Sequence, residues 1–544
     1  MASSFKEKAL NWNRPQWPGL LIIVLLTFLA YSPALNGDFL WDDDLHITKK
    51  KTVIGEESFK RIWTTSDAVY YPLVLTTFWV EWRLWNGQPM GFHIVNVLLH
   101  AINAVLLCFL FQQLGIKWAW LGGAIFALHP VHVESVAWIT ELKNVQSGFF
   151  YLLALLFYLR FLDNRKKQWY SATLIMFLAA LLSKPSTVML PVILLIIHWW
   201  LNRSLQKKDI FYIVPFFVLS ALASLWTIWE QQYHSGAIGS EWSIGLFERI
   251  AIAGYNIWFY ISKLIFPYNL MFFNPHWSID PTSINSYFPL VLLIVLCTVL
   301  LRKYKTWGKP VLIAASYFII TLFPILGFFN FYFMRYSFVG DHFQYLPSMG
   351  IIALITSGAA LHFEKWDLAQ TKKTFSWQKA GAGMGLAVLL IFTVLTWKQG
   401  HIYKDLETLL RHSIDKNPKA WMAHSNLGMM YAEKGLLDKA LFEFKETVRI
   451  YPEHSAAHNS LGNIYLLQKK YVLANEKYRD ALKFAPEDKG FLYNLALSYE
   501  GVGNLKLARE YYKNILENAS PAENQDMIKE VKNRFLNLQR RQDK

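Results

Sequence analysis

The sequence predicts an α-helical polytopic membrane protein, with a bundle of about 11 transmembrane helices followed by a C-terminal all-α repeat solenoid. Of the 544 residues, 54% are hydrophobic and 17% are charged, whereas a soluble domain carries about a quarter charged residues. Apolar runs near the length of a membrane span recur through the first three quarters of the chain, and a fixed period repeats in the last quarter. The 39 Phe, 27 Tyr and 23 Trp exclude a disordered chain.

Each predicted span is an apolar run long enough to cross most of the roughly 30 Å of hydrocarbon in a bilayer. The first run ends without a convincing small-x-small cleavage site, so we expect a retained span rather than a signal peptide. A twelfth run at 247–266 contains Glu248, Arg249 and Lys263, which are costly in lipid, and we interpret it as an interfacial or re-entrant helix. A twelfth span buried among the others is the alternative. The predicted spans lie near residues 18–35, 93–113, 117–129, 146–162, 168–183, 186–201, 210–229, 285–301, 310–329, 344–362 and 380–397.

Basic residues collect in the short segments between alternate spans, where the positive-inside rule makes them cytoplasmic. The net charge of +15 therefore reflects the orientation of the chain in the membrane and does not indicate nucleic-acid binding. With the N-terminus cytoplasmic, all the clusters share one side only if the 247–266 run does not cross the membrane, which gives eleven crossings and an extracytoplasmic C-terminus. The clusters are Lys6, Lys8 and Arg14; Arg160, Arg165, Lys166 and Lys167; Arg203, Lys207 and Lys208; Arg302, Lys303, Lys305 and Lys309; and Lys365, Lys372, Lys373 and Lys379.

The last quarter of the chain repeats every 34 residues, with small residues where two helices touch, aromatic residues between them, and proline ending each unit. We therefore divide the chain into a membrane domain, 1–402, and a repeat domain, 403–544, with repeats near 421–454, 455–488 and 489–522. The pattern is that of tetratricopeptide repeats, whose groove binds peptides or proteins; a merely structural appendage is the alternative. The repeated positions are Leu427-Gly428, Leu461-Gly462 and Leu495-Ala496; Tyr431, Tyr465 and Tyr499; Ala440, Ala474 and Ala508; Phe444, Tyr478 and Tyr512; and Pro418, Pro452 and Pro486.

Three successive carboxylates, Asp42, Asp43 and Asp44, follow the first predicted span. Charges this close cannot all ionise freely, so one pKa should rise toward a value suited to a general base. We assign Asp42 or Asp43 as catalytic and Asp44 as supporting, with a solvated acidic loop or helix cap as the alternative. Adjacent aspartates are weak support for a metal site, so we assign no metal ligand or cofactor, although a divalent ion is compatible with them.

The positive-inside rule does not explain cations on the external side of the membrane. Binding of a lipid-linked phosphate would explain them. In the external segments these are Lys143, Lys184 and Arg335, with Arg249 and Lys263 on the doubtful helix. Anchoring at the membrane surface is the alternative for Arg335 and Lys263.

Polar residues also occur within the predicted bundle. His93, Asn96 and His100 form one helical stripe, and His132 and Glu134 follow at the external end of the third span. Ionisable residues in a membrane indicate a functional site, while hydrogen bonding between helices is an equal alternative. The spacing of His132 and Glu134 disfavours an HExxH-type zinc site.

The motifs together resemble the transmembrane and tetratricopeptide repeat-containing O-mannosyltransferase family, of the GT-C glycosyltransferase fold, and especially its bacterial relatives. The resemblance implies a polyprenyl- or dolichyl-phosphate-linked sugar donor, an acidic pair in the first external loop, and repeats on the same side as that loop. Relatives usually have arginine where His342 stands, so His342 could hold a phosphate only when protonated. They also usually have ERKD or GRAD where this chain has the segment ELKN at 141–144. The stretches that carry the resemblance are FLWDDDLHI, YYPLVLTTF, GFHIVNVLLHA, FALHPVHVESVAWITELKNV, LLSKPSTVMLP, IFPYNLMFF, DHFQYLPSMG and SNLG.

We therefore predict a GT-C-type inverting glycosyltransferase of a bacterial inner or plasma membrane. It would move a sugar, taken as mannose, from a polyprenyl phosphate to Ser/Thr hydroxyls of extracytoplasmic proteins held by the repeat groove. Two other classes stay open: a non-catalytic membrane-anchored scaffold or assembly factor, and a glycosyltransferase acting on a lipid or glycan. The predicted phosphate-binding residues are Lys143, His342, Lys184 and Arg335, and the predicted supporting polar residues are Asp44, His93, His132, Glu134 and Asp341.

Overall fold

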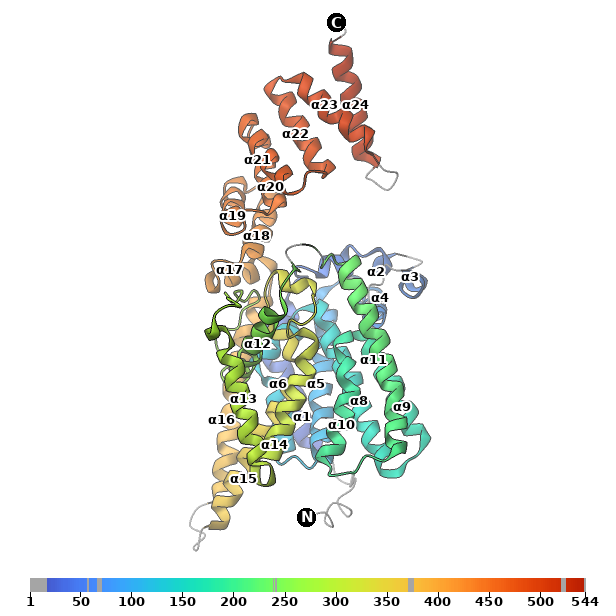
Figure 1. Cartoon of the computed structure of the whole chain (residues 1–544), viewed down its shortest axis with the longest axis vertical. Coiled ribbons are helices and arrows are strands. Elements are labelled where there is room, and N and C mark those ends of the chain that lie inside the picture. The colour runs from blue at the N-terminus through green and yellow to red at the C-terminus, as the bar shows by residue number, and fades with distance from the viewer. Residues whose placement is uncertain are drawn as a thin grey trace. The chain divides into compact units, whose positions relative to one another are not determined.

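The computed structural model describes residues 17–55, 58–65, 71–237, 239, 242–369, 376–519 and 525–542. The chain forms two compact units, Met1–Leu409 and Leu410–Lys544. Both are built from helices, and the described residues contain no β-strand (Figure 1). The basic residues at 6, 8, 14, 372 and 373 lie outside the described residues.

The first unit is a helical bundle whose helices are joined by short turns and by longer segments such as 266–283. α17 Leu406–Lys416 lies across the division between the two units. The helices of the first unit are α1 Trp17–Ala30, α2 Lys51–Ile54, α3 Ser58–Thr64, α4 Pro72–Trp85, α5 Pro89–Gln113, α6 Ala119–Leu128, α7 Val133–Ala137, α8 Leu142–Asn164, α9 Lys167–Ser183, α10 Leu190–Trp200, α11 Lys207–Tyr233, α12 Leu246–Ile265, α13 Phe288–Arg302, α14 Lys309–Leu322, α15 Ser348–Ala369 and α16 Trp377–Gly400.

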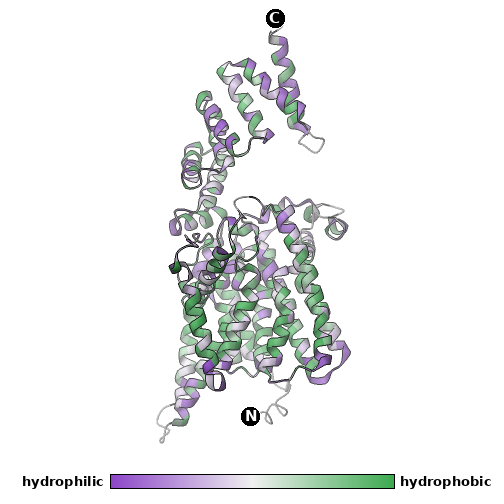
Figure 2. Cartoon of the chain, viewed as in Figure 1, coloured by the Kyte–Doolittle hydropathy of each residue, from purple (hydrophilic) through white to green (hydrophobic). Residues whose placement is uncertain are grey.

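Six helical segments among the described residues are long and apolar enough to cross a membrane. The bundle helices are mainly green in Figure 2, with paler and purple residues between the green stretches. Three other apolar segments are shorter: Trp17–Ala30, Ala119–Leu128 and Pro185–Trp200. Each predicted run contains a helix, but α1 has 14 residues, a rise of about 21 Å against roughly 30 Å of hydrocarbon. The count of 11 crossings therefore stays a prediction. The six segments are Pro89–Gln113, Ile139–Asn164, Lys207–Tyr233, Ile284–Arg302, Tyr304–Ile325 and Trp377–Tyr403.

Small residues allow the central helices to approach closely, as is usual in membrane bundles. A Cβ atom on Gly123 of α6 would lie 2.1 Å from the sulfur of Cys108 in α5. One on Gly148 of α8 would lie 2.8 Å from the ring of Tyr345. Larger side chains at these glycines would push apart the helices that lead to the site described below.

The polar stripe on α5 joins helices within the bundle by hydrogen bonds. Asn96 Nδ2 donates to the Trp138 carbonyl at 3.3 Å. His93 Nε2 lies 3.2 Å from the Gly37 carbonyl oxygen, and His100 Nδ1 lies 2.9 Å from the Tyr345 hydroxyl. His132 Nε2 lies 3.1 Å from the Ser348 hydroxyl. These side chains are buried, and they satisfy polar groups that no water can reach.

The second unit consists of paired helices whose packing follows the repeat pattern. A Cβ on Gly428 would lie 2.9 Å from the Phe444 ring, and one on Gly462 would lie 2.5 Å from the Tyr478 ring. The aromatic side chain of each second helix thus fills the space that the small residue of the first helix leaves. The helices are α18 Trp421–Glu433, α19 Leu437–Ile450, α20 Ser455–Leu467, α21 Tyr471–Phe484, α22 Lys489–Val502, α23 Leu505–Glu517 and α24 Gln525–Gln542.

Candidate functional site

The structure places the three successive aspartates in three different environments. Asp43 is fully buried and accepts hydrogen bonds at both carboxylate oxygens. The Leu40 amide donates to Oδ2 at 2.7 Å, the Thr140 amide donates to Oδ1 at 2.8 Å, and the Thr140 hydroxyl also donates to Oδ1. Burial raises the pKa of Asp43 to about 7, although these hydrogen bonds oppose the rise. Asp43 therefore ties the loop after α1 to the helical turn Ile139–Glu141.

Asp42 differs because its carboxylate is partly exposed and makes no hydrogen bond to any residue within the described ranges. Burial raises the pKa of Asp42 to about 6. The cation of Lys143 opposes that rise and the carboxylate of Glu141 adds to it. Asp42 thus has a pKa near neutral pH and oxygens available to a ligand, which are the properties of a general base.

Asp44 is a surface residue by comparison. Its side chain is 46% exposed, and its carboxylate pairs with Lys49 Nζ at 2.6 Å and accepts from the Thr48 hydroxyl at 2.7 Å. Hydrogen bonds from Lys49 and Thr48 lower the pKa of Asp44, although its partial burial opposes them. Asp44 therefore fits the solvated-loop interpretation, which Asp42 and Asp43 do not.

Trp41, which directly precedes the aspartates, is held by a cluster of aromatic side chains. Its φ of 40° is in the left-handed region, which is uncommon for a bulky residue and is maintained only by surrounding contacts. The Trp41 ring stacks on Trp138 at 5.8 Å between ring centres. Phe272, Phe273 and Tyr336 contact it edge-on at 5.2 to 5.5 Å. This aromatic cluster brings the segment 272–273 against the loop that carries Asp42.

Two of the four predicted phosphate-binding residues meet at one carboxylate. Lys143 Nζ lies 3.3 Å from Glu141 Oε1, and Lys184 Nζ lies 3.1 Å from Glu141 Oε2. Lys184 Nζ also donates to Asn144 Oδ1 at 2.7 Å. Both lysine side chains are 15% exposed, and that of Glu141 is 3% exposed. We call Lys143, Glu141 and Lys184 the Lys–Glu–Lys cluster.

The Lys–Glu–Lys cluster has a formal charge of +1, since one carboxylate faces two ammonium groups. Aromatic rings lie against both lysines, with Lys143 Nζ 5.4 Å from the Tyr71 ring centre and Lys184 Nζ 5.7 Å from that of Phe343. Charges in such a poorly hydrated place interact more strongly than they do in water. The cluster can therefore bind a monoanion such as a phosphodiester.

His342 is brought to the same region but faces a different partner. Its Nδ1 lies 2.6 Å from Glu134 Oε1, and Asn144 Nδ2 donates to its backbone carbonyl at 3.0 Å. Burial lowers the pKa of His342 to about 3, although the carboxylate of Glu141 opposes this. His342 is therefore neutral at pH 7, and the positive charge in this region is that of the two lysines.

The other predicted cations contact protein oxygens. Arg335 Nη1 lies 3.5 Å from the Tyr332 hydroxyl. Arg249 donates to the carbonyls of Ile244 at 3.0 Å and Gly327 at 2.7 Å. Lys263 Nζ donates to the carbonyls of Tyr268 and Asn269, both at 2.9 Å. The contacts of Arg249 and Lys263 give these two cations a structural reason to lie where they do.

The remaining predicted supporting residues, His93, His132, Glu134 and Asp341, are all buried. His93 and His132 hold helices together, as described above, and Glu134 holds His342. Asp341 is buried in the helical turn Asp341–Gln344 beside His342. Within the residues that the structure describes, no group of three or more His, Cys, Asp or Glu side chains is arranged to hold a metal ion.

Glu141, Thr140 and Asn144 belong to the site but were not among the residues predicted from the sequence. Glu141 and Asn144 flank Lys143 in the segment ELKN, which the sequence distinguishes only by its departure from the family pattern. The available signal was the acidic residue two positions before a cation at the end of a span. Thr140 gave no comparable signal, because its role depends on the position of Asp43.

The pH dependence of the sugar transfer predicted from the sequence should follow the protonation state of Asp42. A general base acts in its deprotonated form, so catalysis should rise with pH through about 6 and level off above it. From pH 7 to pH 5 we expect kcat/KM to fall about tenfold, as one group of this pKa becomes protonated. The measurement is the pH–rate profile of the purified chain, with thermal unfolding at each pH as the control. A profile that stays flat down to about pH 4.5 would exclude Asp42 as the base.

Fold and site together define an integral membrane protein with helical repeats and a buried acid–cation site. Residues 404–452 and 443–489 match the family model described as Tetratricopeptide repeat. Over 465 residues the chain is 23% identical to a protein O-mannosyl-transferase of Caenorhabditis elegans, covering 80% of this chain and 63% of that protein. It is 23% identical over 506 residues to the protein O-mannosyl-transferase TMTC1 of Homo sapiens, covering 80% and 55%.

One shorter match has a higher sequence identity. The chain is 32% identical over 187 residues to the protein O-mannosyl-transferase Tmtc1 of Drosophila melanogaster, covering 31% of this chain and 21% of that protein. The chain is thus a relative of the TMTC protein O-mannosyl-transferases, which confirms the resemblance drawn from the motifs. It spans 55 to 63% of the length of the nematode and human relatives.

Proposed function

We propose that this chain is a membrane glycosyltransferase that moves mannose from a polyprenyl-phosphate donor to Ser/Thr hydroxyls of extracytoplasmic proteins. The observation that carries the proposal is that the Asp42 carboxylate lies close enough to the Lys–Glu–Lys cluster for Lys143 and Glu141 to shift its pKa. The names of the relatives support the sugar and the acceptor class. The apolar helices around the site support a donor that is dissolved in the membrane.

The proposed chemistry is a single in-line displacement at the anomeric carbon. Asp42 takes the proton of the attacking hydroxyl, the new C–O bond forms on one face of the sugar, and the bond to the phosphate oxygen breaks on the other. The anomeric configuration inverts. The departing phosphate gains one negative charge, and Lys143 and Lys184 stabilise it because they are already positioned in a dry site.

Glu141 has a specific part in this proposal. It is the shared counter-ion of both lysines, and it keeps two like charges together at low cost. The surplus charge of +1 matches the single charge of a phosphodiester donor. The attraction then increases when the bond to the sugar breaks and the phosphate becomes a dianion, so the cluster favours the transition state over the bound donor.

The repeats would hold the acceptor protein near the membrane site and so raise its effective concentration.

One assay tests both the donor class and the acceptor class. The purified full chain is incubated with either polyprenyl-phosphate mannose or a nucleotide mannose, and periplasmic extract serves as the acceptor. We expect mannose in the protein fraction with the lipid donor alone. Mannose in the lipid or glycan fraction would favour the other enzyme class, and no transfer at all would favour a scaffold.

The topology is a separate expectation, because all basic clusters share one side only if the C-terminus is extracytoplasmic. A reporter active only in the cytoplasm, fused after residue 544, should be silent. The same reporter fused in the α8–α9 connection, after Lys166, should be active and is the control. A strong signal from the C-terminal fusion would contradict both the topology and the proposed acceptor class.

A further inference from the structure

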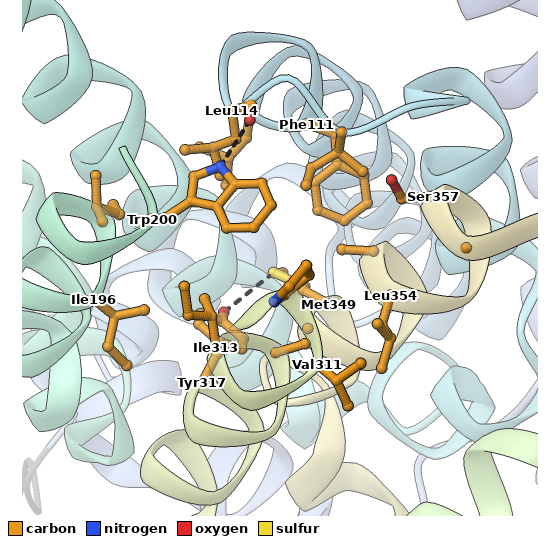
Figure 3. A pocket seen from close by; sticks show the side chains of 18 of the residues that line it. Phe111, Leu114, Ile196, Trp200, Val311, Ile313, Tyr317, Met349, Leu354 and Ser357 are labelled. Carbon is orange, nitrogen blue, oxygen red and sulfur yellow. Dashed lines mark hydrogen bonds between the residues drawn. The ribbon is translucent and has the colours of Figure 1, made fainter. Parts of the chain in front are cut away.

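An apolar cavity of about 440 Å³ lies among α5, α8, α10, α14 and α15, away from the candidate site (Figure 3). Aliphatic and aromatic side chains form nearly all of its wall, as Ile196, Val311 and Leu354 illustrate. The few polar atoms on the wall are largely occupied. Trp200 Nε1 donates to the Leu114 carbonyl at 2.8 Å, and the Tyr317 hydroxyl donates to the Leu346 carbonyl at 3.3 Å. Such a wall suits a hydrocarbon chain rather than a polar ligand.

The cavity reaches the surface at the end of the first unit where α5 and α10 end and α14 begins. The short helical turn Tyr304–Gly308, which joins α13 to α14, supplies Thr306 and Trp307 to the cavity wall. Trp307 is 53% exposed, so this part of the wall borders the surroundings of the protein. Tryptophan at such a rim is typical of the boundary between hydrocarbon and headgroups.

The rim is strongly cationic. The segment from 302 to 309 contains Arg302, Lys303, Lys305 and Lys309 and no acidic residue. The side chains of Arg302, Lys303 and Lys305 are exposed, and they lie in sequence directly beside the cavity-lining Thr306 and Trp307. Basic residues at the bilayer surface attract anionic lipid headgroups.

We propose that the cavity holds one acyl chain of an anionic phospholipid whose headgroup phosphate lies against Lys303 and Lys305. The site is independent of the proposed transferase activity. It is also distinct from the place of the donor phosphate, because Leu155 of the cavity wall lies three turns of α8 beyond Asn144, about 16 Å farther along the helix. The cationic rim and the Lys–Glu–Lys cluster lie at opposite ends of the bundle.

The test is native mass spectrometry of the full chain in detergent, with added phosphatidylglycerol or with phosphatidylcholine of the same acyl chains. We expect one retained phosphatidylglycerol, with an apparent affinity at least tenfold above that of phosphatidylcholine. The double substitution Lys303→Gln and Lys305→Gln should reduce the preference to near unity, whereas Lys166→Gln with Lys167→Gln, which removes the same charge from another connection, should not. These lysines are exposed, so folding should be unaffected.

A substitution that fills the apolar cavity tests whether the cavity holds the acyl chain. A Cβ at Gly358, in the cavity wall, would meet no atom within 4 Å, so Gly358→Leu should fold and should weaken retention of both lipids. Gly383→Leu on α16 is the matched control, because its Cβ also meets nothing within 4 Å and it does not line the cavity. Equal retention of the two lipids by the unchanged protein would overturn the proposal. So would displacement of phosphatidylglycerol by polyprenyl phosphate, which would assign the cavity to an isoprenoid chain.

Discussion

Asp42→Asn is expected to lower the turnover number by roughly 10² to 10⁴-fold, the range that loss of a general base produces. Asparagine keeps the shape of the side chain but cannot accept a proton. The Asp42 carboxylate makes no hydrogen bond within the described residues, so the substitution should leave the fold and the donor KM nearly unchanged. The measurement is steady-state transfer by the purified variant, with thermal unfolding recorded on the same sample.

The neighbouring aspartates are the matched controls for this prediction. Asp43→Asn should act through stability, because its amide cannot serve as acceptor to all three donors from Leu40 and Thr140. Asp44→Asn should have little effect on either property, because it loses a surface ion pair worth about 1 kcal/mol or less. A kcat loss at Asp43 without loss of stability, together with an active Asp42→Asn, would transfer the role of base to Asp43.

Lys184→Met should lower kcat by about 10² to 10³-fold, the usual effect of removing one preorganised group that stabilises developing negative charge. Methionine keeps most of the length of the side chain and removes the ammonium group. The Lys–Glu–Lys cluster then becomes neutral, so donor binding should also weaken and KM should rise. Lys184→Arg should restore part of the activity, because it returns the charge with a different geometry.

The control for this prediction is Lys117→Met, which also breaks a Lys–Glu pair, with Glu364, in an exposed place. It should leave both kinetic constants unchanged. Unchanged kcat and KM in Lys184→Met would exclude the Lys–Glu–Lys cluster as the phosphate site.

The helical elements were largely predictable, since apolar length and the 34-residue period each depend on local sequence. The segments predicted at 93–113 and 380–397 correspond to α5 and α16. Apolar length did not determine the number of membrane crossings. α1 and α6 have only 14 and 10 residues, and helix length alone does not decide whether such segments span a membrane.

The distinction between Asp42 and Asp43 could not be read from three identical adjacent residues. It depends on Thr140, which is 97 residues away in sequence and whose amide and hydroxyl both donate to Asp43. Similarly, the sequence suggested Lys143 and Lys184 separately, but their common counter-ion Glu141 became apparent only from their distances. The protonation of His342 depends on burial and on its contact with Glu134, neither of which a local motif contains.

The proposed reaction moves a sugar from a lipid phosphate to a protein hydroxyl, with Asp42 as the base. The most direct measurement is mass spectrometry of a Ser/Thr-containing acceptor after incubation with polyprenyl-phosphate mannose and the purified full chain. We predict one added hexose per modified hydroxyl with the unchanged protein, and transfer by Asp42→Asn that is slower by about two orders of magnitude or more. Hexose addition at equal rates by both proteins would contradict this claim.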